Sequence, residues 1–211
     1  GIVAKAREGG LIDWLHITDR GRSSETRGHW DSPADFMSHV APAFSLDLWQ
    51  TQGQRVEVWV EKDALSDVVK RACRPLDVPY TACKGYMSAS TMWESAQRMS
   101  HNWVFNRQQT TVLHLGDHDP SGIDMTRDIE ERLNLFANEP ANGRLRAATR
   151  GCEITVDRIA LTMDQIREYE PPPNFAKDTD ARFQSYKDEY GEESWELDAL
   201  EPSVIVDLIT S

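Results

Sequence analysis

Three acidic residues lie where the sequence predicts strands to end. Glu61 closes the segment RVEVWVE, and Asp117 and Asp119 follow the segment TTVLHL within LGDHDPSG. Carboxylates two residues apart in a turn can converge on one hard cation, and Mg²⁺ binds a few carboxylate oxygens while keeping water molecules and substrate phosphates as its other ligands. These residues are therefore candidate ligands of Mg²⁺ or Mn²⁺ and candidate catalytic groups.

Each of these carboxylates also has an ordinary explanation. Glu61 alone is typical of a solvated strand end, and Asp117 with Asp119 is typical of a pair that caps a helix and forms a turn. Their order favours a site, because a Glu ends one strand, a glycine-containing loop follows the next, and Asp-x-Asp follows the third. In an open parallel sheet, ligands bind beyond the carboxyl ends of the strands. The helix predicted from Pro120 would direct its amino end toward a phosphate there.

Alternating strands and helices are predicted to position these residues. Alternating or continuously apolar segments predict strands, and apolar residues at helical spacing predict helices. Strands are predicted over residues 55–61, 78–83, 110–115 and 153–161, and helices over 63–73, 88–105 and 120–136. Such repeats imply right-handed crossovers, a parallel sheet and helices on both faces. We therefore predict an α/β, Rossmann-like fold with a central, mostly parallel four-stranded sheet flanked by helices.

Two smaller pieces are predicted to flank this core, which spans residues 55–162. Residues 1–54 form a predicted N-terminal extension, in which Ser32 caps a helix that begins at Pro33 and reaches about residue 44. Residues 163–211 are predicted to form a helical C-terminal extension that packs on the core.

The net charge of the chain is relevant to whether it binds nucleic acid. The formal net charge is −12, and nearly all of the acidic excess lies beyond residue 56. A protein that binds DNA electrostatically usually presents a basic face. Two interpretations stay open: some carboxylates bind a metal ion that offsets their charge, or the partner is not nucleic acid.

Neither a membrane nor an oxidising compartment is indicated. The sequence has no run of eighteen apolar residues and no signal-peptide pattern. Its three cysteines, Cys73, Cys83 and Cys152, match neither a disulfide framework nor a zinc site. We therefore expect a cytoplasmic protein.

The motifs resemble those of the Toprim fold, which topoisomerases, primases and some nucleases share. The chain is most similar to the A subunit of topoisomerase VI and its meiotic double-strand-break relatives, which carry a VEK-type strand end, a KGYxS segment and a D-x-DPxG turn. This chain has VEKDAL, KGYMS and DHDPSGID, and its WELDALEP is similar to the family's closing ELEAL-type segment. The likeness extends from about Val56 to Ile209.

The resemblance implies roles for individual residues. Glu61, Asp117 and Asp119 would bind Mg²⁺, Glu61 could instead act as a general acid/base, and Asp124 would be an outer ligand. The implied partner is DNA in a nucleoid-associated setting, with strand cleavage by transesterification in a homodimer or with a partner subunit. Possible contacts with phosphate or DNA are Lys62, Lys84, Gly85, Arg144, Arg146 and Lys177.

The nucleophile of these relatives has no counterpart at the expected place. Theirs is a tyrosine on a winged-helix-like domain that precedes the Toprim domain. All five tyrosines of this chain lie at or after the second predicted core strand. Residues 11–22 are interpreted as the tail of such a domain, with the remainder upstream. A non-catalytic, metal-dependent DNA-binding module therefore stays open as an alternative.

Two other interpretations concern the turn itself. Five residues fall at positions 1, 3, 5, 6 and 12 of an EF-hand loop, namely Asp117, Asp119, Ser121, Gly122 and Asp128, although a strand precedes them. A haloacid-dehalogenase-like phosphatase would use Asp117 as nucleophile and Asp119 as acid, although that pair usually follows the first core strand. Of the nearby histidines, His114 is predicted to be packed within a strand and His118 to be a solvated turn residue.

Overall fold

The structure, a computed structural model, describes residues 29–41, 44–138, 149–176 and 178–211, together with residues 2, 5, 6 and 9–11. The chain forms two compact units, residues 1–46 and residues 47–211. The larger unit contains the sheet and all three candidate carboxylates. It begins upstream of residue 55, where the sequence predicted the core to start.

The smaller unit contains α2 (Pro33–Val40), whose start agrees with the prediction. The Ser32 Oγ accepts a hydrogen bond from the amide of Asp35 at 3.1 Å, and Pro33 is the first helical residue. The helix ends at Val40, earlier than predicted, and none of its residues is buried. A short helix without tertiary packing is marginal in water, which accounts for the early end. Residues 12–22 of the predicted winged-helix tail lie outside the described residues.

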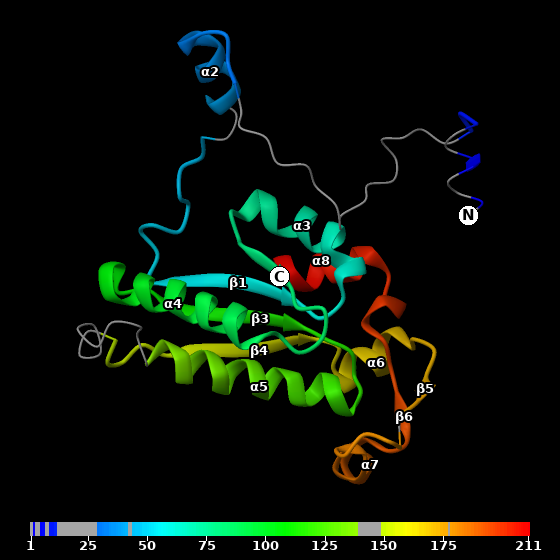
Figure 1. The fold of residues 1–211 in the computed structure, drawn as a ribbon. Helices are drawn as coiled ribbons and strands as arrows, with labels where there is room; N and C mark the ends of the chain where they lie inside the picture. Colours follow the sequence, from blue (N-terminus) through cyan, green and yellow to red (C-terminus); the bar gives the residue numbers. More distant parts are fainter. Residues whose placement is uncertain are drawn as a thin grey trace. The chain divides into compact units, whose positions relative to one another are not determined.

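A four-stranded parallel sheet forms the centre of the larger unit, as predicted (Figure 1). Its strands are β1 (Gln54–Val60), β2 (Tyr80–Ala82), β3 (Gln109–Leu115) and β4 (Ile154–Ala160), in the order β2-β1-β3-β4. The last residues of β1, β3 and β4 are in register, because Val60 pairs with Leu115 and Leu115 with Ala160. The carboxyl ends of the three strands therefore lie at one edge of the sheet.

Helices cover both faces of the sheet (Figure 1). Side chains of β1 alternate between two cores, with Val58 and Val60 in one and Trp59 in the other. The first core is covered by α3 (Ser66–Cys73), α6 (Met163–Tyr169) and α8 (Pro202–Thr210), and the second by α4 (Ala89–Asn106) and α5 (Pro120–Ala137). Short 3₁₀ turns, η3 (Asp63–Leu65) and η4 (Arg74–Leu76), flank α3. The predicted α/β fold with helices on both faces is confirmed.

The C-terminal part is less helical than predicted. Besides α7 (Phe183–Tyr190) and the 3₁₀ turn η5 (Leu197–Ala199), it contains a two-stranded antiparallel ribbon of β5 (Asn174–Phe175) and β6 (Glu193–Ser194). Strands of two residues are too short to show an alternating pattern, so this ribbon could not be predicted from periodicity.

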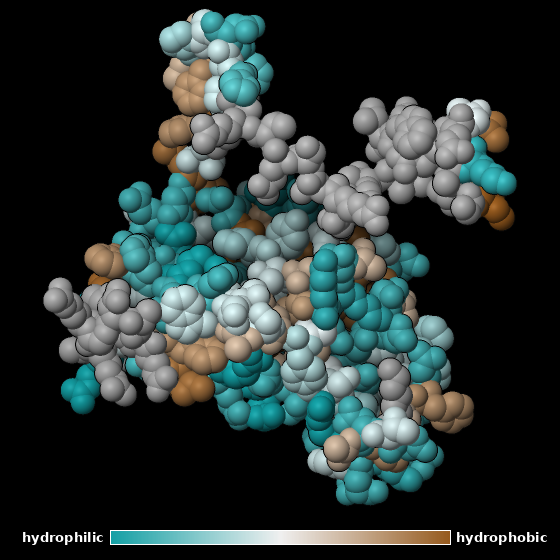
Figure 2. All heavy atoms as spheres, viewed as in Figure 1, coloured by the Kyte–Doolittle hydropathy of each residue, from teal (hydrophilic) through white to brown (hydrophobic). Residues whose placement is uncertain are grey.

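The outer surface of the molecule is largely polar on the face shown in Figure 2. Hydrophilic side chains dominate this face, and hydrophobic ones occur there in small separate groups. Within the parts of the chain that the structure describes, every helix is too short or too polar to cross a membrane.

An ion pair between the buried Glu57 and the half-exposed Arg98 joins β1 to α4. The Glu57 carboxylate is buried and accepts hydrogen bonds from the Arg98 guanidinium at 2.8 and 3.0 Å and from the Trp59 indole at 3.2 Å. A charge out of water is tolerated only when it is paired and hydrogen-bonded. Arg98 therefore permits Glu57 to occupy an inward-facing position of the central sheet.

Replacing Arg98 by Met should lower the free energy of unfolding by about 2 kcal/mol, because it leaves a buried carboxylate without its counter-ion. The double variant with Glu57→Gln should recover part of this loss, since no buried charge then remains. Urea unfolding followed by circular dichroism measures both. Arg167→Met, which removes a largely exposed pair with Asp164, is the matched control and should change stability by less than about 0.5 kcal/mol. Equal effects at the two arginines would contradict the prediction.

Candidate carboxylate site

Glu61 and Asp117 lie side by side because they follow adjacent parallel strands. The amide of Glu61 donates to the carbonyl of Leu115 at 2.8 Å, which extends the β1–β3 pairing by one residue. The amide of Asp117 donates to Oε2 of Glu61 at 2.9 Å. The Glu61 side chain therefore joins the two strand ends directly, as the sheet topology predicted.

Asp119 is the N-cap of α5. Its Oδ1 accepts hydrogen bonds from the amide of Gly122 at 2.6 Å and from Ser121 Oγ at 2.9 Å. A Cβ at Gly122 would collide with the carbonyl of Asp117, so only glycine allows the turn to fold this closely against the start of the helix. Since α5 begins at Pro120, the turn delivers both aspartates to the amino end of a helix.

The start of α5 also excludes the EF-hand interpretation. An EF-hand loop keeps its ligands at positions 1 to 12 on a chain that wraps around Ca²⁺. In the structure Ser121, Gly122 and Asp128 are already within the helix Pro120–Ala137. The backbone cannot wrap a cation there, and that interpretation is wrong.

Lys62 links Asp117 to the C-terminal part of the chain. Its Nζ lies 3.4 Å from Oδ1 of Asp117, and it donates hydrogen bonds to Glu196 at 2.8 Å and to Asp198 at 2.7 Å. Burial opposes the charge of this ammonium, but the surrounding carboxylates outweigh it and raise the pKa of Lys62. Lys62, a predicted contact for phosphate or DNA, is thus paired with three carboxylates of its own chain.

Arg158, which lies on β4 beneath the turn, was not predicted from the sequence. Its guanidinium donates to four carbonyls and one hydroxyl, those of Gly116, Asp117, Gly122, Leu161 and Thr126. Burial lowers the pKa of Arg158 to about 10, while Glu61, Asp117 and Asp119 act in the opposite direction. The sequence feature that could have indicated its role is a charged arginine near the end of the strand predicted over residues 153–161, where the following residues are apolar.

The three carboxylates influence one another electrostatically. Burial raises the pKa of Glu61 to about 7, and the negative charges of Asp117 and Asp119 add to this effect, against the hydrogen bond from the Asp117 amide. Burial also raises the pKa of Asp117, against a hydrogen bond from the amide of Leu197 at 2.8 Å. A carboxyl group that titrates near neutral pH is suited to general acid/base chemistry.

Each of the three carboxylates keeps one oxygen that accepts no hydrogen bond from any residue that the structure describes: Oε1 of Glu61, Oδ2 of Asp117 and Oδ2 of Asp119. Asp117 and Asp119 line the same cavity, of about 360 Å³. The other residues that line it are Asn174, Phe175, Ser194, Trp195 and Glu196.

This donor set has the chemistry that Mg²⁺ requires. Mg²⁺ is usually bound by one or two carboxylates, with waters and substrate phosphates as the remaining ligands, and Asp117 and Asp119 can supply the two. The side chains do not form a ready coordination shell, because in the described parts of the chain no three His, Cys, Asp or Glu residues are grouped so as to hold a metal. Glu61 is therefore better placed as an acid/base than as a third ligand.

His118 is buried, contrary to the prediction of a solvated turn residue. Its Nδ1 lies 2.7 Å from the Tyr186 hydroxyl, and its backbone amide and carbonyl pair with Trp195 at 2.8 and 3.0 Å. Burial lowers the pKa of His118 to about 4. The prediction was wrong because the residues that cover His118 come from the distant C-terminal part. His114 is packed within β3 as predicted.

Asp124, the predicted outer ligand, lies in a separate network. One of its oxygens accepts a hydrogen bond from Tyr86 at 2.7 Å, and the other accepts two from Arg127. Burial opposes ionisation, but these bonds outweigh it and lower the pKa of Asp124. Arg182 also donates to the Tyr86 hydroxyl at 2.7 Å. Unlike the three carboxylates above, Asp124 has both oxygens engaged by side chains of its own chain.

Lys84 and Gly85 form a turn that is attached to Glu61. Both have positive φ angles, 56° and 86°, and the amide of Lys84 donates to the carbonyl of Glu61 at 2.9 Å. The exposed Lys84 side chain lies 3.4 Å from Asp63. The structure thus brings this loop to the carboxylate edge. Arg144, Arg146 and Lys177 lie outside the described residues.

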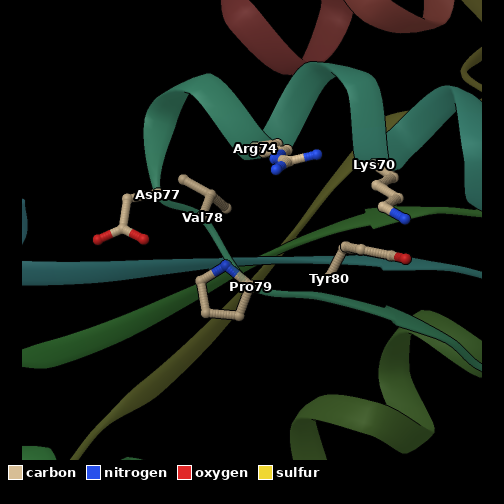
Figure 3. Close-up of a pocket in the computed structure, with 6 residues that line it drawn as sticks. All are labelled: Lys70, Arg74, Asp77, Val78, Pro79 and Tyr80. Atoms are coloured by element: carbon tan, nitrogen blue, oxygen red, sulfur yellow. The ribbon is translucent and has the colours of Figure 1, made fainter. Parts of the chain in front are cut away.

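A second cavity, of about 400 Å³, is lined by residues of α3, η4 and β2. Figure 3 shows Lys70 and Arg74 on its helical side and Pro79 and Tyr80 on its strand side. It surrounds the amino end of β2, whereas the three carboxylates follow the carboxyl ends of their strands. The two cavities are therefore separate features of the fold.

No protein-family model matches the chain, and no curated protein or solved structure matches it either.

Replacing Glu61 by Gln should stabilise the protein at alkaline pH. The folded chain holds this proton more tightly than the unfolded chain, because the pKa is about 7 instead of 4.5. Stability is therefore lost as the pH rises from 4.5 through 7. We expect the variant to exceed the wild type by about 1–2 kcal/mol at pH 8, after allowance for partial exposure, and to match it below pH 5.

Urea unfolding at both pH values measures this difference. Glutamine keeps an oxygen that can accept the Asp117 amide, so the comparison isolates the charge. Glu168→Gln, on the exposed side of α6, is the matched control and should show no such pH dependence. A gap between Glu61→Gln and wild type that is the same at pH 5 and pH 8 would contradict the prediction.

Proposed function

We propose that this chain is a Toprim-type domain, similar to the A subunit of topoisomerase VI, that acts on DNA phosphodiesters with Mg²⁺. The observation that carries the proposal is the group of three electrostatically coupled carboxylates beyond the carboxyl ends of β1 and β3. Each keeps one oxygen that accepts no hydrogen bond from the described residues. Ligand sites of parallel α/β sheets lie at this edge.

The position of each carboxylate indicates its proposed role. Asp117 and Asp119 would hold the metal ion, with Mn²⁺ as a substitute. Glu61, whose carboxyl group titrates near pH 7, would give or take a proton at the reacting oxygen. The positive end of the α5 dipole favours a phosphate beside the aspartates. A bound Mg²⁺ would supply stabilisation of the charge on the transferring phosphoryl group.

The metal would also offset the acidity of the site toward DNA. The three carboxylates repel a phosphate backbone, and a divalent cation bound by Asp117 and Asp119 would offset the charge of those two. DNA is thus the proposed partner despite the net charge of −12. Because the proposed substrate is DNA, the proposed location is the cytoplasm, in association with the nucleoid. Strand cleavage would proceed by transesterification, in a homodimer or with a partner subunit, as in the proteins that the motifs resemble.

A second candidate function is a metal-dependent DNA-binding module that does not cleave. One observation favours it: no described tyrosine contacts Glu61, Asp117 or Asp119. The Tyr86 hydroxyl donates to Asp124, and the Tyr186 hydroxyl contacts His118. All five tyrosines of the sequence are among the described residues, so cleavage by a tyrosine nucleophile would then require a tyrosine from an upstream domain or a partner subunit.

Asp117→Asn and Asp119→Asn should each weaken Mg²⁺ binding, measured by titration calorimetry, by at least roughly tenfold, because each removes one anionic ligand of the ion. Glu61→Gln should keep most of the Mg²⁺ affinity but lose Mg²⁺-dependent nicking or relaxation of supercoiled plasmid by roughly 100-fold, since it removes the acid/base. Chelation with EDTA should abolish the reaction in the wild type.

Asp164→Asn, which alters a carboxylate that is 93% exposed on α6, is the matched control and should leave both measurements unchanged. Metal-dependent DNA binding without nicking would favour the non-catalytic module. Asp117-dependent turnover of a small phosphomonoester without DNA processing would favour the phosphatase. Unchanged Mg²⁺ binding in both aspartate variants would overturn the metal site.

A further inference from the structure

An unusually exposed aromatic ring lines the carboxylate cavity. Phe175 of β5 is 88% exposed and lines the same cavity as Asp117 and Asp119. Phenylalanine is usually among the most buried residue types, because exposing its ring to water costs free energy. A ring left in solvent next to a charged cavity is therefore a feature that a ligand would cover.

Backbone pairing fixes Phe175 relative to the carboxylates. Phe175 pairs with Glu193 in the β5–β6 ribbon, and the next amide, of Ala176, donates to Glu192 at 2.9 Å. β6 continues directly into Trp195, which pairs with His118 through two backbone hydrogen bonds. Because His118 lies between the two aspartates, an unbroken series of backbone contacts connects the ring to the turn. Figure 1 shows this ribbon beyond the carboxyl ends of the sheet strands.

Polar groups beside the ring suit a flat, hydrogen-bonding ligand. Asn174 and Ser194 also line the cavity and pair with each other across the ribbon. In the described parts of the chain, the side-chain amide of Asn174 forms no hydrogen bond, and Ser194 Oγ donates to the backbone carbonyl of Asn174 at 3.5 Å. An amide offers a donor and an acceptor in one plane, the pattern that matches the edge of a nucleobase.

We propose that Phe175 is a stacking platform for an unpaired nucleobase next to the phosphodiester at Asp117 and Asp119. This inference rests on the proposed function and specifies its substrate as single-stranded or locally unpaired nucleic acid. In a duplex the faces of each base are covered by its neighbours, so only an unpaired base can present a face to the ring. Stacking on aromatic side chains is a general means of holding such bases, whatever their identity.

In this proposal the Phe175 ring and the carboxylates bind different parts of the nucleic acid. The carboxylates with their metal would contact the backbone phosphate, which every nucleotide carries, and these contacts do not distinguish paired from unpaired strands. The ring adds binding that only an unpaired base can use. Selection for strand state would therefore depend on Phe175, and chemistry at the phosphate on Glu61, Asp117 and Asp119.

The test compares Phe175→Ala with wild type in binding to a fluorescein-labelled oligo-dT and to a duplex of equal length, by fluorescence anisotropy with Mg²⁺ at low salt. The variant should bind oligo-dT roughly tenfold more weakly, as expected for one lost base stack, and the duplex within about twofold of wild type. Phe175→Trp should retain the affinity for oligo-dT. Phe105→Ala is the matched control, because Phe105 is 64% exposed but lies on α4 and does not line the cavity.

Three outcomes would overturn the inference: no loss with Phe175→Ala, an equal loss for oligo-dT and duplex, or an equal loss with Phe105→Ala. Asp117→Asn in the Mg²⁺-binding and plasmid-processing assays of the proposed function distinguishes this from failure of that function. If Phe175→Ala has no effect while Asp117→Asn abolishes processing, only the stacking role fails. If Phe175→Ala reduces oligo-dT binding while the aspartate variants leave Mg²⁺ binding and processing intact, the carboxylate chemistry fails and the base-binding ring stands.

Discussion

The guanidinium of Arg158 is buried under the turn that carries Asp117 and Asp119, and the shape of that turn depends on it. Between β3 and α5 the chain reverses within a few residues. The carbonyl of Gly116 accepts one backbone hydrogen bond, from the amide of Leu161 at 2.9 Å, and the carbonyl of Asp117 accepts none from the described backbone. Arg158 donates to both, and to the carbonyl of Gly122 inside the helix. Buried carbonyls without donors would cost free energy, so one side chain of β4 stabilises the geometry of the whole turn.

The positive charge of Arg158 does not neutralise the site. It favours ionisation of Glu61, yet burial and the neighbouring aspartates outweigh it, and the pKa of Glu61 stays raised at about 7. Lys62 makes a similar contribution at Asp117, but it is shared with Glu196 and Asp198. The remaining negative charge destabilises the apo protein and favours any cation that enters. Such a trade between stability and reactivity is common at functional sites.

Much of the site could be predicted because its geometry follows from local rules. Glu61 and Asp117 end strands whose patterns are clear, and parallel pairing places such residues at one edge. Asp119, Pro120 and Gly122 define the start of a helix through capping chemistry. What the sequence did not predict depends on contacts between distant residues. His118 is buried by Tyr186, 68 residues further on, and Asp117 is held by Leu197, 80 residues further on; no periodicity carries that information.

The segment WELDAL, residues 195–200, explains why the C-terminal part belongs to the site. Trp195 pairs with His118, the amide of Leu197 donates to Asp117, and Glu196 and Asp198 hold Lys62. Each contact orients a group on the carboxylate turn or directly after Glu61, and Trp195 and Glu196 also line the cavity. Because the same segment continues from β6, it also fixes the ribbon that carries Phe175. The position of the exposed ring and the orientation of the carboxylates are thus set by one short stretch of chain, which is the physical reason to treat the ring and the carboxylates as parts of a single site.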